Sequence, residues 1–220
     1  MSAVVFDLDG TLVHSAPDLH AAAVRMLDDF GLPPLSLGKV TSFIGSGVPV
    51  LVERCLAEAG AADVCQDDAL SRFRQHYMAD PATLTRPFPG VLQMLHVLRR
   101  NGYRLGICTN KSADLSLEVL KRLDLVVYFE VVIGGDSLES RKPDPAPLLA
   151  AFEKLGTDIS SGLYVGDSEI DAATAAAAYC DFALFSGGYR KTPADQLRTR
   201  FVFDSFEALT EYILTNRKAA

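Results

Sequence analysis

Short apolar runs alternate with helix-like patterns along most of this chain of 220 residues. The runs fit buried strands at residues 4–6, 103–108, 131–133, 163–165, 182–185 and 201–203. Apolar residues at helical spacing follow at residues 91–100, 113–123, 146–155, 170–178 and 206–214. Strands that alternate with helices form a parallel sheet covered by helices on both faces. The sequence therefore predicts an α/β fold that binds its ligand at the carboxyl ends of the strands.

One stretch, residues 15–85, interrupts this alternation and contains no convincing strand. Ser15 and Asp18 have the spacing of a capping box, and helical patterns follow to Phe30, at 48–59 and at 68–78. We predict a catalytic core of residues 1–14 and 86–220, with residues 15–85 inserted as a helical module. A module joined at both ends above the strand ends is placed to open and close over a ligand.

Composition restricts the class of partner. The net charge is −7, which argues against a broad basic surface for nucleic acid or anionic membrane. The four cysteines are scattered without a Cys-x-x-Cys pair, which favours reduced thiols. The sequence has no signal-peptide pattern and no apolar run of membrane-spanning length. We therefore expect a cytoplasmic protein, a monomer or homodimer, that binds neither nucleic acid nor membrane.

Two carboxylates, Asp7 and Asp9, directly follow the first predicted strand and precede Gly10-Thr11. Burying two negative charges together is unfavourable unless a cation or a catalytic role compensates. The alternative is that these aspartates only cap a helix or a turn. An acidic pair at a strand end favours a hard metal ion and a phosphoryl group over that alternative.

Polar groups also follow three later strands. They are Thr109-Asn110, Lys142 before a proline, and Asp167-Ser168 with Asp171 one helical turn further on. Each has an ordinary alternative, because Thr, Asn and Asp commonly cap helices and an exposed lysine is usually only solvated. Four such groups, each at a different strand end, are hard to attribute to chance.

In this order the four motifs resemble those of the haloacid dehalogenase (HAD) superfamily of phosphotransferases. The resemblance covers nearly the whole chain and implies a Rossmann-like core with an inserted helical cap of the C1 type. Within the superfamily the chain is most similar to the bacterial phosphoglycolate phosphatases, in the stretches 11–19, 31–33, 134–138 and 141–145.

The resemblance implies the roles of the acidic residues. Asp7 is the nucleophile that forms an aspartyl-phosphate, and Asp9 is the general acid and base. Mg²⁺ is the implied cofactor, held by the Asp7 side chain, the Asp9 backbone carbonyl and Asp167. Asp171 and Ser168 lie further out, where Asp171 orients a metal-bound water or the lysine.

The resemblance also implies how the phosphate is held. Lys142 offsets the phosphate charge and steadies Asp7. Thr109 and the Asn110 backbone hold the oxygens that are not transferred, together with N–H groups from Leu8 to Gly10. Groups of this kind stabilise the charge on the transferring phosphoryl.

Substrate choice is expected to lie in the helical module. The segment 43–47 resembles the cap loop that reaches the active site in this family, and we predict that Ser46 and Gly47 contact the substrate. Glycines allow close backbone approach, although an ordinary helix–helix turn has the same composition. Arg54 is a further candidate for an anionic substrate, with an exposed helix-surface arginine as the alternative.

The function implied is Mg²⁺-dependent hydrolysis of a small phosphorylated metabolite, 2-phosphoglycolate first. A phosphatase for another small phosphometabolite and a sugar-phosphate mutase of the same fold remain alternatives. Asp9 argues against carbon–halogen cleavage, since dehalogenase relatives lack an acid there. A non-enzymatic phospho-acceptor similar to response-regulator receivers is disfavoured, because receivers are shorter and have no inserted module.

Overall fold

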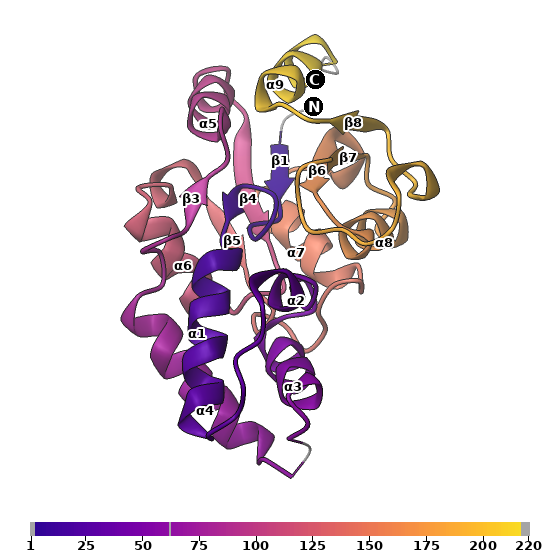
Figure 1. Ribbon diagram of the computed structural model, residues 1–220. Helices are drawn as coiled ribbons and strands as arrows, with labels where there is room; N and C mark the ends of the chain where they lie inside the picture. The colour runs from indigo at the N-terminus through magenta and orange to yellow at the C-terminus, as the bar shows by residue number, and fades with distance from the viewer. Residues whose placement is uncertain (1–2, 62, 217–220) are drawn as a thin grey trace.

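The computed structural model describes residues 3–61 and 63–216. Within these residues, one parallel sheet has the strand order β5-β4-β1-β6-β7-β8 (Figure 1). Its strands are β1 (Ala3–Phe6), β4 (Arg104–Cys108), β5 (Val131–Ile133), β6 (Gly162–Gly166), β7 (Phe182–Phe185) and β8 (Phe201–Phe203). The predicted parallel α/β fold is confirmed, and each predicted strand agrees with the structure to within one residue at either end.

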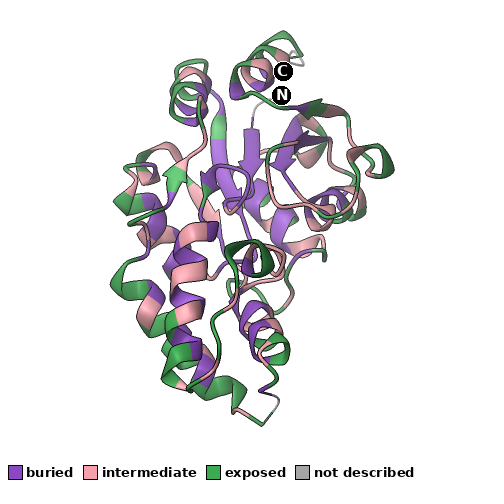
Figure 2. Ribbon diagram, viewed as in Figure 1, coloured by how far each residue is buried: buried purple, intermediate pink, exposed green. Residues whose placement is uncertain are grey.

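Helices cover both faces of this sheet. They are α5 (Val91–Arg100), α6 (Ala113–Arg122), α7 (Ala146–Lys154), α8 (Glu169–Ala177) and α9 (Phe206–Thr215). Short 3₁₀ turns lie at η1 (Val126–Tyr128), η2 (Ile159–Ser161) and η3 (Ala194–Gln196). The side chains of a strand alternate between faces. Accordingly, Val4 and Phe6 join the hydrophobic cluster of α5, α6 and α9, whereas Ala3 and Val5 join that of α7 and α8. Figure 2 shows the central strands buried between these layers.

The helical module lies beyond the carboxyl end of β1 (Figure 1). It contains α1 (Ala16–Asp29), α2 (Leu37–Thr41), α3 (Val48–Glu58) and α4 (Gln66–Ala79). α1 packs on α4, and α3 packs on both. The sequence did not predict α2, which is only five residues long. The division into a core and a module at residues 15 and 85 stays a prediction.

Two short strands, β2 (Val13–His14) and β3 (Arg86–Pro87), lead into and out of the module and pair antiparallel. The predicted capping box beside them is wrong, because the Ser15 side chain makes no cap hydrogen bond. The Asp18 carboxylate instead accepts hydrogen bonds from the N–H groups of Leu84 and Thr85 and from the Thr85 hydroxyl, at 2.6 to 3.0 Å. A long-range partner thus replaces the local one and ties the two connections together.

Within the described ranges, no helix has both the length and the apolar character that a membrane crossing requires.

Candidate active site

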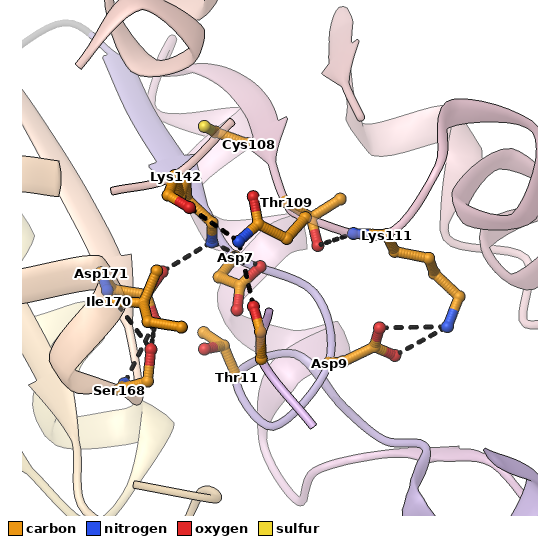
Figure 3. A network of polar contacts seen from close by, with 12 residues as sticks. Asp7, Asp9, Thr11, Cys108, Thr109, Lys111, Lys142, Ser168, Ile170 and Asp171 are labelled. Carbon is orange, nitrogen blue, oxygen red and sulfur yellow. Dashed lines mark hydrogen bonds and ion pairs between the residues drawn. The ribbon is translucent and has the colours of Figure 1, made fainter. Parts of the chain in front are cut away.

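The site forms where three neighbouring strands end together. β1 pairs with β4 on one side and β6 on the other, so that Phe6 lies level with Ile107 and Val165. The residues that follow these strands therefore meet at one edge of the sheet. As predicted, the four motifs that are far apart in sequence lie side by side there (Figure 3).

Lys142 lies at the centre of one group of contacts. Its ammonium is 2.6 Å from Asp171 Oδ1, 3.0 Å from Asp7 Oδ1 and 2.8 Å from the Tyr164 hydroxyl, which also lies 2.7 Å from Asp171 Oδ1. The lysine side chain is only 2% exposed. Burial opposes its charge, but Asp171 and Asp7 outweigh burial and raise the pKa of Lys142. Lys142 is therefore a fixed positive charge beside Asp7.

Three buried carboxylates, those of Asp7, Asp167 and Asp171, have oxygens within 4.8 Å of one another. Burial raises the pKa of Asp7 to about 6 against the opposing effect of Lys142. Burial, followed by the charges of Asp171 and Asp7, raises the pKa of Asp167 well above its usual value. These raised pKa values show that burial makes the ionised form of both carboxylates unfavourable, and a bound cation would offset that cost. An all-oxygen group of this kind fits a hard divalent cation.

The three carboxylates differ in how many hydrogen bonds they already accept. Asp171 Oδ1 accepts from Lys142, and its Oδ2 accepts from the Ser168 hydroxyl at 2.6 Å and from the Ser168 N–H at 3.1 Å. Burial opposes the ionised form of Asp171, but Lys142 and these hydrogen bonds lower its pKa. Asp171 is thus committed to holding Lys142, which leaves Asp7 and Asp167 as the side chains with oxygen available for a metal.

Asp167 is positioned by two contacts that the sequence did not reveal. The Thr11 hydroxyl donates to its Oδ1 at 2.8 Å, and the Tyr189 N–H donates to its Oδ2 at 2.6 Å. The Tyr189 hydroxyl in turn lies 2.9 Å from His14 Nδ1 and accepts from the Ala16 N–H at 3.1 Å. The loop after β7 therefore connects the acidic cluster to the entry into the helical module.

Gly10 must be a glycine for a steric reason. Its φ is +90°, and a Cβ there would lie 2.6 Å from Asp167 Oδ2. Its N–H donates to the Val13 carbonyl at 2.9 Å, so this group already has a partner within the turn. The structure therefore supports a steric role for Gly10, which allows the turn after β1 to pack closely against Asp167.

Asp9 belongs to a separate group of contacts. Both its carboxylate oxygens accept hydrogen bonds from the Lys111 ammonium, at 3.0 and 3.1 Å. That ammonium also lies 4.6 Å from the ring centroid of Tyr77, which comes from α4 of the helical module. Burial opposes the charge of Lys111, but Asp9 and Tyr77 outweigh burial and raise its pKa. In Figure 3, Lys111 and Asp9 lie on the opposite side of Asp7 from Asp171.

Thr109 and Asn110 lie between these two groups. Both are buried, and the Thr109 hydroxyl accepts a hydrogen bond from the Lys111 N–H at 3.3 Å. The Asn110 side chain donates to the Gly45 and Lys142 carbonyls, each at 3.0 Å. Asn110 therefore joins the loop of the helical module to the core.

A small pocket opens between the core and the helical module. Its walls include Asp7, Asp9 and Thr109 from the core and Gly45 and Gly47 from the module loop. Ser46, which the sequence also predicts to contact the substrate, is not one of its lining residues. The cavity has a volume of about 30 Å³, on the order of one ordered water molecule. The structure is thus closed, and a substrate needs the module loop to withdraw before it can enter.

Sequence reasoning missed Lys111, Tyr164 and Tyr189 as parts of the site. Lys111 follows the Thr-Asn motif directly, so its position at a strand end was the available signal. Tyr164 lies inside β6, where an aromatic residue is ordinary core, and Tyr189 lies in a loop without a recognisable pattern. No local signal distinguishes these two.

Comparison with known proteins identifies the class. Residues 4–185 match the model of the haloacid dehalogenase-like hydrolase family. This range covers most of the chain, and the protein therefore belongs to that family. The predicted family, its fold and the expected class of enzyme, a phosphatase, are confirmed.

Individual relatives carry more specific names than the family model does. The chain is 49% identical to the phosphoglycolate phosphatase of Cereibacter sphaeroides (strain ATCC 17029 / ATH 2.4.9), over 97% of this chain and 98% of that protein. It is 44% identical to the plasmid phosphoglycolate phosphatase of Cupriavidus necator, over 99% and 95%. The crystal structure of a predicted phosphoglycolate phosphatase from Haemophilus somnus 129PT superposes with a TM-score of 0.91 at 32% identity, over 96% and 97%.

Proposed function

We propose that the protein hydrolyses 2-phosphoglycolate to glycolate and phosphate, with Mg²⁺ as cofactor and an aspartyl-phosphate intermediate. The observation that carries this proposal is Asp7, which lines the pocket, contacts Lys142 and shares a buried acidic cluster with Asp167 and Asp171. The curated relatives support the choice of substrate, since a protein that is 49% identical over 98% of its length carries the name phosphoglycolate phosphatase.

In the first step an oxygen of Asp7 attacks phosphorus, and the bond from phosphorus to the glycolate oxygen breaks. Asp9 donates a proton to that leaving oxygen. Lys142 offsets negative charge beside Asp7, and the hydroxyl of Thr109, a residue that lines the pocket, holds a phosphoryl oxygen. Mg²⁺, bound by Asp7, Asp167 and the Asp9 carbonyl, would neutralise charge on the phosphoryl group.

In the second step a water molecule attacks the phosphorus of the aspartyl-phosphate and releases inorganic phosphate. Asp9, now ionised, removes the proton of that water, which restores its starting state. The Asp9 side chain is suited to this role because it is not part of the acidic cluster that would hold the metal. The two aspartates of the first motif therefore have different tasks.

The proposal is tested by phosphate release from 2-phosphoglycolate and from a panel of small phosphoesters that includes glucose 1-phosphate, with and without Mg²⁺. We expect a clear preference for 2-phosphoglycolate that depends on the metal. Asp7→Asn should lower kcat by at least about 10³-fold while its circular dichroism and melting temperature remain those of a folded protein. Near-normal turnover by that variant would contradict the mechanism.

A substrate preference for another phosphometabolite, or formation of glucose 6-phosphate from glucose 1-phosphate, would replace 2-phosphoglycolate with one of the alternative functions. A stable phosphoprotein without turnover would favour the phospho-acceptor.

We further propose that the enzyme acts in the cytoplasm as a monomer or homodimer, on a small substrate and without nucleic acid or membrane. The free thiols support a reducing compartment, since Cys55 and Cys108 are buried and unpaired in the described part of the chain.

A further inference from the structure

Lys111 is a buried cation that the proposed mechanism does not use. Its side chain is 2% exposed, and its ammonium contacts the Asp9 carboxylate and the ring of Tyr77. Within the described residues it is the only cationic side chain that lines the pocket shared by Asp7, Asp9 and Thr109. Burying a lysine is costly, so it needs an anion within reach at every stage of the reaction.

The partner that Lys111 has in this closed structure is also needed elsewhere. Both oxygens of Asp9 accept hydrogen bonds from the Lys111 ammonium. To give a proton to the leaving oxygen, Asp9 must turn at least one of these oxygens toward the substrate. The ion pair therefore has to open during turnover, and Lys111 then requires a second anion.

We propose that Lys111 binds the carboxylate of the substrate and releases Asp9 as it does so. This inference rests on the proposed function and names the residue that selects the substrate. In 2-phosphoglycolate only one methylene and one oxygen separate the carboxylate carbon from phosphorus. A phosphoryl group at Asp7 thus places the carboxylate in the same pocket as Lys111.

The rest of the pocket favours this partner. Its walls on the side of the helical module are apolar and include Leu19, Val48 and Leu51. In the part of the chain that the structure describes, no other lining residue offers the carboxylate a positive charge. Apolar walls exclude water and strengthen an interaction between charges. The site is built to accept one small anionic group beside the phosphoryl group.

This exchange makes the carboxylate part of the chemistry as well as of binding. A substrate with the carboxylate removes Lys111 from Asp9, so that the Asp9 carboxylate can receive a proton from solvent and pass it to the leaving oxygen. A substrate without a carboxylate leaves Asp9 bound to Lys111, so kcat should be lower and KM higher. Sites that bind a polar group of the substrate reject analogues that lack it far more strongly than apolar sites do.

The test compares 2-phosphoglycolate with ethyl phosphate, which has a methyl group in place of the carboxylate. The wild type should prefer 2-phosphoglycolate in kcat/KM by at least about 100-fold. Lys111→Met should lose most of that preference, because kcat/KM should fall far more for 2-phosphoglycolate than for ethyl phosphate. Lys111→Gln also removes the charge that the carboxylate needs, so it should lose the preference as well, and it serves if the Met variant does not fold. Lys154→Met, an exposed lysine on α7, is the matched control.

Binding gives a readout without turnover. In the Asp7→Asn background, calorimetry should show that Lys111→Met weakens the binding of 2-phosphoglycolate at least about tenfold. The affinity for inorganic phosphate should not change. If both ligands lost the same affinity, or if Lys111→Met kept the preference for 2-phosphoglycolate, the role of Lys111 would be wrong, whereas the proposed function would stand. A wild type without preference for 2-phosphoglycolate would overturn the proposed function and this inference together.

Discussion

Two buried lysines, Lys142 and Lys111, stand on opposite sides of Asp7, and they are held in different ways. Each is 2% exposed and lies within 3.0 Å of an aspartate oxygen. Lys142 contacts Asp171 and Tyr164 as well as Asp7, and all these partners belong to the core. Lys111 has a single carboxylate, and its ring contact comes from the helical module.

The comparison indicates which charge stays in place and which one moves. Lys142 retains Asp171 whatever happens at Asp7, so it can remain still while Asp7 reacts. Lys111 has no second carboxylate among its described contacts, so that it must move when Asp9 acts. A fixed charge suits the nucleophile, whereas an exchangeable charge suits recognition of the substrate.

The largest effect is expected for Lys142→Met. It leaves Asp7 and Asp171 buried without their cation, and breaking a buried ion pair typically costs about 3–5 kcal/mol. Urea unfolding should show a loss of that size together with loss of activity. Lys111→Met should cost clearly less, because it leaves one carboxylate, Asp9, without its cation, whereas Lys142→Met leaves two, and the Asp171 side chain is completely buried. The opposite order of stability would contradict the distinction between the two lysines.

A second prediction concerns pH and the metal. Since the pKa of Asp7 is raised from 3.8 to about 6, the folded, metal-free protein binds a proton more tightly there than the unfolded chain does. Its contribution to stability is full below pH 3.8 and is lost as the pH rises to about 6. Asp7→Asn removes this dependence, so the variant should gain about 1–3 kcal/mol relative to wild type across that range.

Urea unfolding of metal-free wild type and Asp7→Asn at several pH values measures this difference. Mg²⁺ should favour the ionised carboxylates and stabilise the wild type more at pH 7 than at pH 5. A stability difference between the two proteins that does not change with pH would show that Asp7 is not the group whose pKa is raised.

The smallest effect is expected for Tyr77, which connects Lys111 to the helical module. Tyr77→Leu removes the cation–π contact, which is worth about 0.5–2 kcal/mol. The value of kcat/KM for 2-phosphoglycolate should fall by about threefold to thirtyfold, and kcat/KM for ethyl phosphate should change less. Tyr77→Phe keeps the ring and should stay close to wild type. If Phe were as damaging as Leu, the hydroxyl rather than the ring would be the contact that matters.

Sequence reasoning was most accurate where the signal is local. The apolar periodicity of the core strands and helices agrees with the structure to within one residue at each end, because burial on one or both faces imposes that periodicity. Local reasoning failed at Ser15 and Asp18, where a capping-box spacing was present but Asp18 bonds instead to Leu84 and Thr85. A short-range pattern cannot reveal a competing partner more than sixty residues away.

The amino-acid sequence was enough to predict that Asp7, Thr109, Lys142 and Asp167 follow strands, and hence that they meet at one edge of a parallel sheet. Order along the chain was sufficient, because parallel strands end on the same side. The contact between Lys111 and Asp9, which are 102 residues apart in sequence, became visible only in the folded protein, where the Tyr77 ring of the helical module packs against the lysine. The direction of a loop side chain depends on what packs over it, and here that packing comes from a separate part of the chain.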